Sequence, residues 1–149
     1  MTVPSLGRDL LLTPFFRADE WDVLDLERRP AGTPWRDEPV DLAVADDVEA
    51  LRQALVIRLL TPKGTLTELG HAGYGSRLHE LIGEQDGEVT RLRARLYVLE
   101  AIGQERRVEE VISLDISSST AAPDRLFVNA QVKPVGRGDP VSLGLEVGL

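Results

Sequence analysis

The sequence predicts an α+β fold, with three helices packed on one face of a small antiparallel three-stranded sheet and an extended N-terminal arm. Apolar residues recur at helical spacing between residues 46 and 102, and from Val108 onward they alternate with polar residues, as in half-buried strands. The first 40 residues contain five prolines, which disfavour a long helix there. We therefore expect an arm over residues 1–40 and one domain over residues 41–149.

The arm is rich in aromatic residues as well as proline. Two short apolar pieces, residues 10–12 and 21–26, are long enough to add to the domain as strands. Aromatic side chains are enriched where proteins contact one another. We expect the arm to contact a partner through its four large aromatic residues, which are Phe15, Phe16, Trp21 and Trp35.

The first helix of the domain should begin at Asp46, because Asp46 and Glu49 have the spacing of a capping box. It should stop at Thr61, since Pro62 disfavours helical geometry in the residue before it. Its core face is expected to carry four apolar residues at helical spacing, namely Val48, Leu51, Leu55 and Leu59.

Two more helices are expected. Ser76 can cap a short one, which Gly83 would end with a positive φ angle. The third should run over residues 87–102, with Gly103 as its C-cap. Its core stripe is predicted to consist of Val89, Leu92, Leu96 and Leu99.

The last 42 residues predict three strands separated by turns. In the first, one face should carry Val108, Glu110, Ile112, Leu114 and Ile116. In the last, the alternating residues are Val141, Leu143, Leu145 and Val147. If this strand lies at the sheet edge, an extended segment of another chain can add to it. The alternative is an unpaired edge, protected by its shortness and by Glu146.

The composition excludes several classes of function. There is no cysteine, which rules out disulfides and thiolate chemistry, and a net charge of −8 disfavours nucleic-acid binding. No segment is apolar enough to suggest a signal peptide or a membrane span. His71 and His79 lack a recognised zinc spacing, and the acids around Glu84 and Glu88 have the composition of a solvated turn. We expect no catalytic residues, cofactor or metal.

Residues 104–107 place an acid and two guanidinium groups where a helix gives way to a strand. Glu105, Arg106 and Arg107 can form ion pairs with a partner or within the chain, because the Arg fork matches a carboxylate. Alternatively, the two arginines only stabilise the helix C-terminus.

Two motifs in the middle of the chain resemble those of a known family. The first is R-L-x-T-x-x-G over residues 58–64, and the second is Y-G-S-x-L over residues 74–78. They resemble the baseplate wedge or sheath-initiator family, also called gene-twenty-five-like or GPW. The family occurs in contractile phage tails, type VI secretion systems and extracellular contractile injection systems. The motif positions are Arg58, Thr61, Gly64, Tyr74, Gly75, Ser76 and Leu78.

The family also has a Glu-Pro-Arg motif, which Glu105 and Arg107 match while Arg106 replaces the proline. The resemblance implies a structural protein that joins the baseplate wedge through this motif. Its implied partners are the sheath subunit, other wedge proteins and the hub or inner-tube initiator proteins, in several copies of a sixfold-symmetric assembly. It would template the sheath by strand addition, being cytoplasmic during assembly and then part of the particle. The alternative is a lysozyme-like enzyme that cleaves peptidoglycan.

Overall fold

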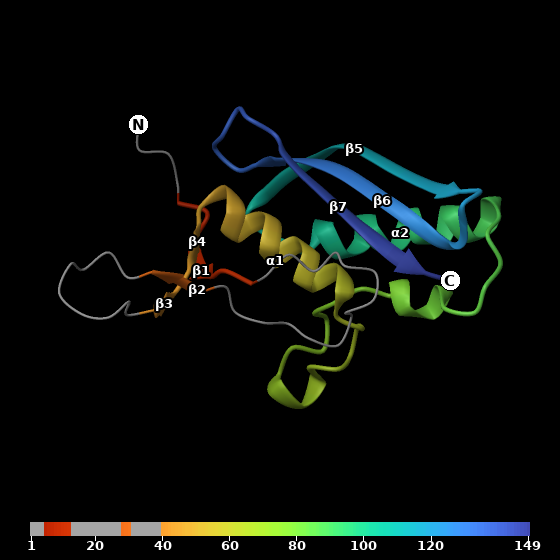
Figure 1. Ribbon diagram of the computed structural model, residues 1–149, viewed down its shortest axis with the longest axis horizontal. Coiled ribbons are helices and arrows are strands. Elements are labelled where there is room, and N and C mark those ends of the chain that lie inside the picture. The colour runs from red at the N-terminus through yellow and green to blue at the C-terminus, as the bar shows by residue number, and fades with distance from the viewer. Residues whose placement is uncertain (1–4, 13–27, 31–39) are drawn as a thin grey trace.

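The computed structural model describes residues 5–12, 28–30 and 40–149, with the side chains of 28–30 and 40–42 left undescribed. The main body combines α1 (Val48–Leu60) and α2 (Glu88–Gly103) with a sheet of β5 (Val108–Ser119), β6 (Ala122–Pro134) and β7 (Val141–Gly148) (Figure 1). The sheet is antiparallel and its strand order is β5-β6-β7, so β5 and β7 form its two edges. Helix α2 packs against β5, and α1 packs against β7.

Four short strands lie beside the start of α1 (Figure 1). Strand β1 (Arg8–Leu10) pairs with β4 (Val44–Asp46), and β2 (Arg28–Pro30) pairs with β3 (Val40–Leu42), both antiparallel. Leu6, just before β1, is buried in the main core. The aromatic residues expected to contact a partner from the arm lie outside the described residues: Phe15, Phe16, Trp21 and Trp35.

The predicted fold class, three helices packed on one three-stranded sheet, is wrong. The described chain has two α-helices, and two small two-stranded sheets accompany the three-stranded one. Between α1 and α2 there are only the 3₁₀ helices η1 (Thr67–Leu69) and η2 (Leu78–Leu81). Gly83, with φ of 88°, follows too soon after Ser76 for an α-helix to form, because the first helical turn is costly to nucleate.

Helix α1 begins differently from the prediction and ends as predicted. Asp46 pairs with Arg8 across β1 and β4, so the expected capping box does not form. Asp47 holds the N-cap position, and its carboxylate accepts a hydrogen bond from the Leu6 N–H at 3.0 Å. This bond lowers the pKa of Asp47, as does its pairing with Arg137. The helix stops before Thr61, which is extended.

Helix α2 turns a different face to the core from the one predicted. Val89, Leu92, Leu96 and Leu99 are 71, 59, 60 and 37% exposed, respectively. The buried residues are instead Thr90, Ala94, Tyr97, Val98, Ala101 and Ile102. This side also reads as apolar, and its two alanines let the helix approach the sheet closely. Gly103 is the last helical residue and Gln104 the C-cap, which corrects the expected glycine cap.

The sheet has one apolar and one polar face, and in β5 the residues on the apolar face differ from those predicted. Register shifts at Val108/Glu110 and Val111/Ser113 mark β-bulges, and each adds a residue that switches the alternation of side chains. Ile112 is therefore 48% exposed, and Val111 packs on the core in its place. In β6 and β7 the alternation is as predicted. No helix in the described part of the chain has the length and apolar character needed to cross a membrane.

Candidate functional site

The residues of the two family-like motifs meet at the end of α1. The Thr61 hydroxyl donates to the Ile57 carbonyl at 2.7 Å, and the Thr61 carbonyl accepts from the Ser76 N–H at 2.8 Å. The Lys63 N–H donates to the Ser76 carbonyl at 2.8 Å, so residues 62 and 76 form a short parallel bridge. This bridge joins two segments that the sequence separates by more than ten residues.

Gly75 and Ser76 fit this bridge for steric and polar reasons. A Cβ atom on Gly75 would lie 2.4 Å from the Thr61 carbonyl oxygen, and φ of Gly75 is 105°, which L side chains rarely adopt. The Ser76 hydroxyl is buried, where it donates to the Leu59 carbonyl at 2.5 Å and accepts from the Leu78 N–H at 3.2 Å. Gly64, with φ of 94°, forms the turn that follows.

Arg58 connects these motifs to residues 105–107. Its guanidinium lies 4.4 Å from the centre of the Tyr74 ring, and one of its nitrogens lies 3.4 Å from a carboxylate oxygen of Glu105. Partial burial raises the pKa of Tyr74. The Y-G-S-x-L tyrosine therefore lies over the arginine of the first motif, an arrangement that neither motif predicts alone.

Glu105 and Arg107 form a fork-to-fork pair within the chain. The Arg107 Nε and Nη2 atoms donate to the two Glu105 oxygens at 2.8 and 3.0 Å, and these bonds lower the pKa of Glu105. Arg107 Nη1 also donates to the Leu6 carbonyl at 2.7 Å, which ties the N-terminal segment to the body. Glu105 is only 9% exposed. Arg106 is exposed, and no described residue pairs with it.

Strand β7 forms one of the two edges of the sheet. Leu149 donates to the Asp124 carbonyl at 2.7 Å, and the register from there places the backbone bonds to β6 at odd-numbered residues. The predicted strand-addition residues, Val141, Leu143, Leu145 and Val147, therefore bond to β6 and bury their side chains in the core. The outward N–H and C=O groups belong to Ser142, Gly144, Glu146 and Gly148.

This edge is open over part of its length. Arg52 Nε donates to the Ser142 carbonyl at 2.9 Å and so covers the start of β7. No described residue bonds to the outward backbone groups of Gly144, Glu146 or Gly148. Two of these residues are glycines, which leave room for an approaching backbone. The alternation of β7 was visible in the sequence, but the phase of its hydrogen bonds required the pairing with β6.

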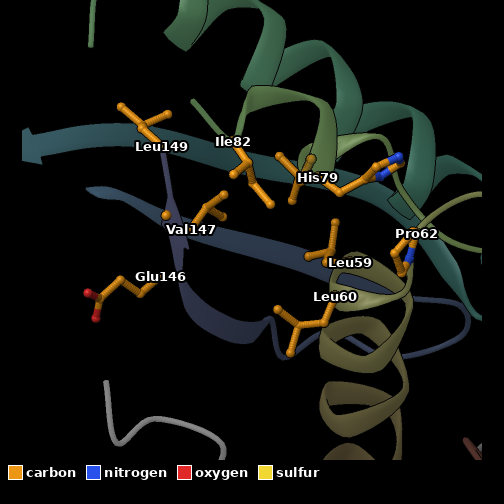
Figure 2. A pocket seen from close by; sticks show the side chains of 10 residues that line it. Leu59, Leu60, Pro62, His79, Ile82, Glu146, Val147 and Leu149 are labelled. Atoms are coloured by element: carbon orange, nitrogen blue, oxygen red, sulfur yellow. The ribbon is translucent and has the colours of Figure 1, made fainter. Parts of the chain in front are cut away.

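An apolar groove borders the open end of β7. Figure 2 shows side chains from the end of α1, from η2 and from the end of β7 around it. The groove has a volume of about 370 Å³. Its lining is Leu59, Leu60, Pro62, Leu78, His79, Ile82, Glu146, Val147, Gly148 and Leu149. Sequence analysis missed this groove, because residues 59–62, 78–82 and 146–149 meet only in the folded chain.

The acidic residues near η2 are paired with arginines. Arg77 binds Glu80 through two bonds of 2.8 and 2.9 Å, and Arg91 binds Asp86 at 2.8 and 2.6 Å. These bonds lower the pKa of Glu80 to about 2 and that of Asp86 to about 2. Arg93 pairs with Glu84. Among the described residues, no three of His, Asp and Glu are grouped as metal ligands would be.

Comparison with solved structures finds a likeness to a tail protein. No protein-family model matches the chain, and no curated protein matches it. A crystal structure of a protein from Geobacter sulfurreducens, provisionally named a tail lysozyme, superposes with a TM-score of 0.58 and 22% sequence identity. The match covers 68% of this chain and 89% of that one. The chain therefore shares the fold of that tail protein.

Proposed function

We propose that this chain is a structural baseplate component of a phage-like contractile tail, which templates the sheath by accepting a β-strand along β7. The observation that carries the proposal is the edge at residues 144–148, whose outward backbone groups bond to no described residue, beside the apolar groove. The shared fold with a protein named as a tail protein supports the same setting. The motif residues support it further, because their bridge fixes the end of α1 to residue 76, and Leu78 lines the groove beside the end of β7.

The edge offers a defined set of bonds to an added strand. Gly144, Glu146 and Gly148 each present one N–H and one C=O group outward. A backbone hydrogen bond contributes about 0.5–1.5 kcal/mol net, so several are needed for a durable contact. Because these bonds do not depend on side chains, the affinity of the edge is largely independent of the partner's sequence.

The groove provides the selectivity that the edge lacks. Side chains of an added strand would alternate, and those on the core side would enter the space beside Leu60 and Ile82. Ile82 is 69% exposed, so an added strand could bury apolar surface there. Burying one large apolar side chain contributes about 1.5–3 kcal/mol. We expect the sheath segment to carry apolar residues at alternate positions.

The proposed attachment to the wedge uses the exposed part of the 105–107 segment. The internal pair of Glu105 and Arg107 fixes the backbone on either side of Arg106, so the exposed Arg106 side chain leaves the surface at a defined place. Arg is a residue type enriched in interface hot spots. The arm residues Phe15, Phe16, Trp21 and Trp35 remain the second proposed wedge contact. Hub or inner-tube initiator proteins, and a sixfold arrangement, belong to the same proposal.

A structural role is favoured over peptidoglycan cleavage. A glycosidase needs one carboxyl group with a raised pKa opposite a second carboxylate. Here arginine partners lower the pKa of Glu80 and Asp86, and Glu84 also has an arginine partner. The proposal therefore assigns no turnover to the chain.

The test is co-purification of the sheath subunit with full-length protein carrying a single change at the edge. Glu146→Pro removes one outward N–H and leaves the bonds to β6, whereas Glu146→Ala removes the side chain and keeps that N–H. Proline should abolish sheath recovery and alanine should retain it. Ile82→Asp, in the groove, should also weaken recovery. Sheath recovery equal to wild type with Glu146→Pro would refute strand addition at β7.

A further inference from the structure

The outer face of α2 carries an apolar seam with coiled-coil spacing. Its residues are separated by three, four and three positions, which are the a and d positions of two heptads. We call Val89, Leu92, Leu96 and Leu99 the α2 seam. All four are at least 37% exposed, and the opposite side of the helix faces the core. Apolar residues on both sides are typical of a helix that is buried on both sides, so we expect another protein surface to cover the α2 seam.

The charges beside the seam are arranged in opposite pairs. Glu88 and Arg95 occupy its g positions, while Arg93 and Glu100 occupy its e positions. Arg93 pairs with Glu84, and Glu100 pairs with Lys63. In contrast, among the described residues Arg95 binds only the Leu114 carbonyl, at 2.6 Å, and none pairs with Glu88. Each side of the seam thus carries one acid and one base.

We propose that the α2 seam is covered by the α2 seam of a second copy, with the two helices antiparallel about a two-fold axis. In that register Leu92 meets Leu96 of the second copy, and Val89 meets Leu99. Equivalent flanking positions then face each other, so Glu88 lies beside Arg95 of the second copy. This arrangement pairs the two flanking charges that have no ionic partner among the described residues.

The alternative parallel pairing would use the charges less well. It would set Glu88 against Arg93 and Arg95 against Glu100, and both of those partners already bind residues of their own chain. Antiparallel helices also place opposite ends of their dipoles side by side. A two-fold contact closes after two copies, so it yields a dimer. Six copies around one rotation axis cannot make this contact with each other, so the dimer is a state of the free protein, separate from the proposed sixfold arrangement.

The inference does not depend on strand addition at β7, which lies on other elements. The experiment measures the molar mass of the full-length protein by light scattering and sedimentation over a range of concentrations. We expect the mass to rise from that of a monomer to about twice that value as the concentration approaches about 100 μM. Leu92→Asp should raise the dissociation constant by about tenfold or more. Leu69→Asp is the matched control, because Leu69 is 72% exposed and distant in sequence from α2.

Charge exchange tests the orientation. Glu88→Arg should weaken the dimer, because it sets two arginines together at both ends of the seam. Adding Arg95→Glu should restore the dimer in the antiparallel arrangement, whereas in a parallel one the double variant would place like charges together everywhere. A monomer at all concentrations would overturn the proposal, as would a wild-type dimer that Leu92→Asp leaves intact. Capture of a different protein by a monomeric chain through the seam would also overturn it.

Discussion

Replacing Gly75 by alanine should destabilise the protein far more than the same change at a glycine with a similar backbone. At Gly75 the added Cβ would lie 2.4 Å from the Thr61 carbonyl oxygen and 3.0 Å from the Lys63 nitrogen. At Gly70, where φ is 84°, nothing lies within 4 Å of the added atom. Both variants place an L side chain in the left-handed region, which costs roughly 1–2 kcal/mol.

The difference between the two variants isolates the steric contact. To relieve it, the 62–76 bridge must open, which removes two backbone hydrogen bonds worth about 0.5–1.5 kcal/mol each. Gly75→Ala should therefore lower the free energy of unfolding by about 2–5 kcal/mol in total, and Gly70→Ala should lower it by only about 1–2 kcal/mol.

Urea unfolding followed by circular dichroism gives the free energy of unfolding for each variant, provided that the m-value is unchanged. Equal losses at Gly75 and Gly70 would show that φ alone explains the glycine. The close approach of residue 75 to the Thr61 carbonyl would then add nothing to the free energy of unfolding. The bridge between residues 62 and 76 would not hold their two segments together as described.

Two further predictions concern ion pairs. Arg107→Met should lower the free energy of unfolding by roughly 2 kcal/mol, because it leaves the buried Glu105 carboxylate without its main partner. Arg106→Met, at the exposed neighbouring residue, should change it by no more than about 0.5 kcal/mol. Thermal unfolding of both variants checks this, and equal losses of stability would contradict it. The pKa of Asp86 is about 2 in the folded protein against an ordinary value of 3.8, so its contribution is present above pH 3.8 and is lost as the pH falls toward 2. Asp86→Asn should therefore flatten the acid side of a stability-pH curve, and an unchanged slope would contradict the assignment.

The sequence predicts elements well where a local rule decides them. Pro62 ends α1, and alternation locates the three strands of the larger sheet, because both effects act between neighbouring residues. The bulges in β5 are different, since they depend on the register with β6 and shift Ile112 to the surface. In the same way, the Arg58 contact with Tyr74 joins residues that only the folded chain brings together.

The error at α2 says most about function. Leucine and valine at heptad positions predicted the core side, yet the helix buries the side that carries Tyr97, Val98 and Ile102 and leaves the four predicted residues exposed. Exposing large apolar side chains gives up the free energy of their burial, about 1.5–3 kcal/mol each for full burial. A contiguous apolar patch of this kind is typical of a contact surface. The same hydrophobic pattern that misplaced the core therefore identifies an interface, because periodicity shows which residues favour burial but not whether the chain itself or a partner buries them.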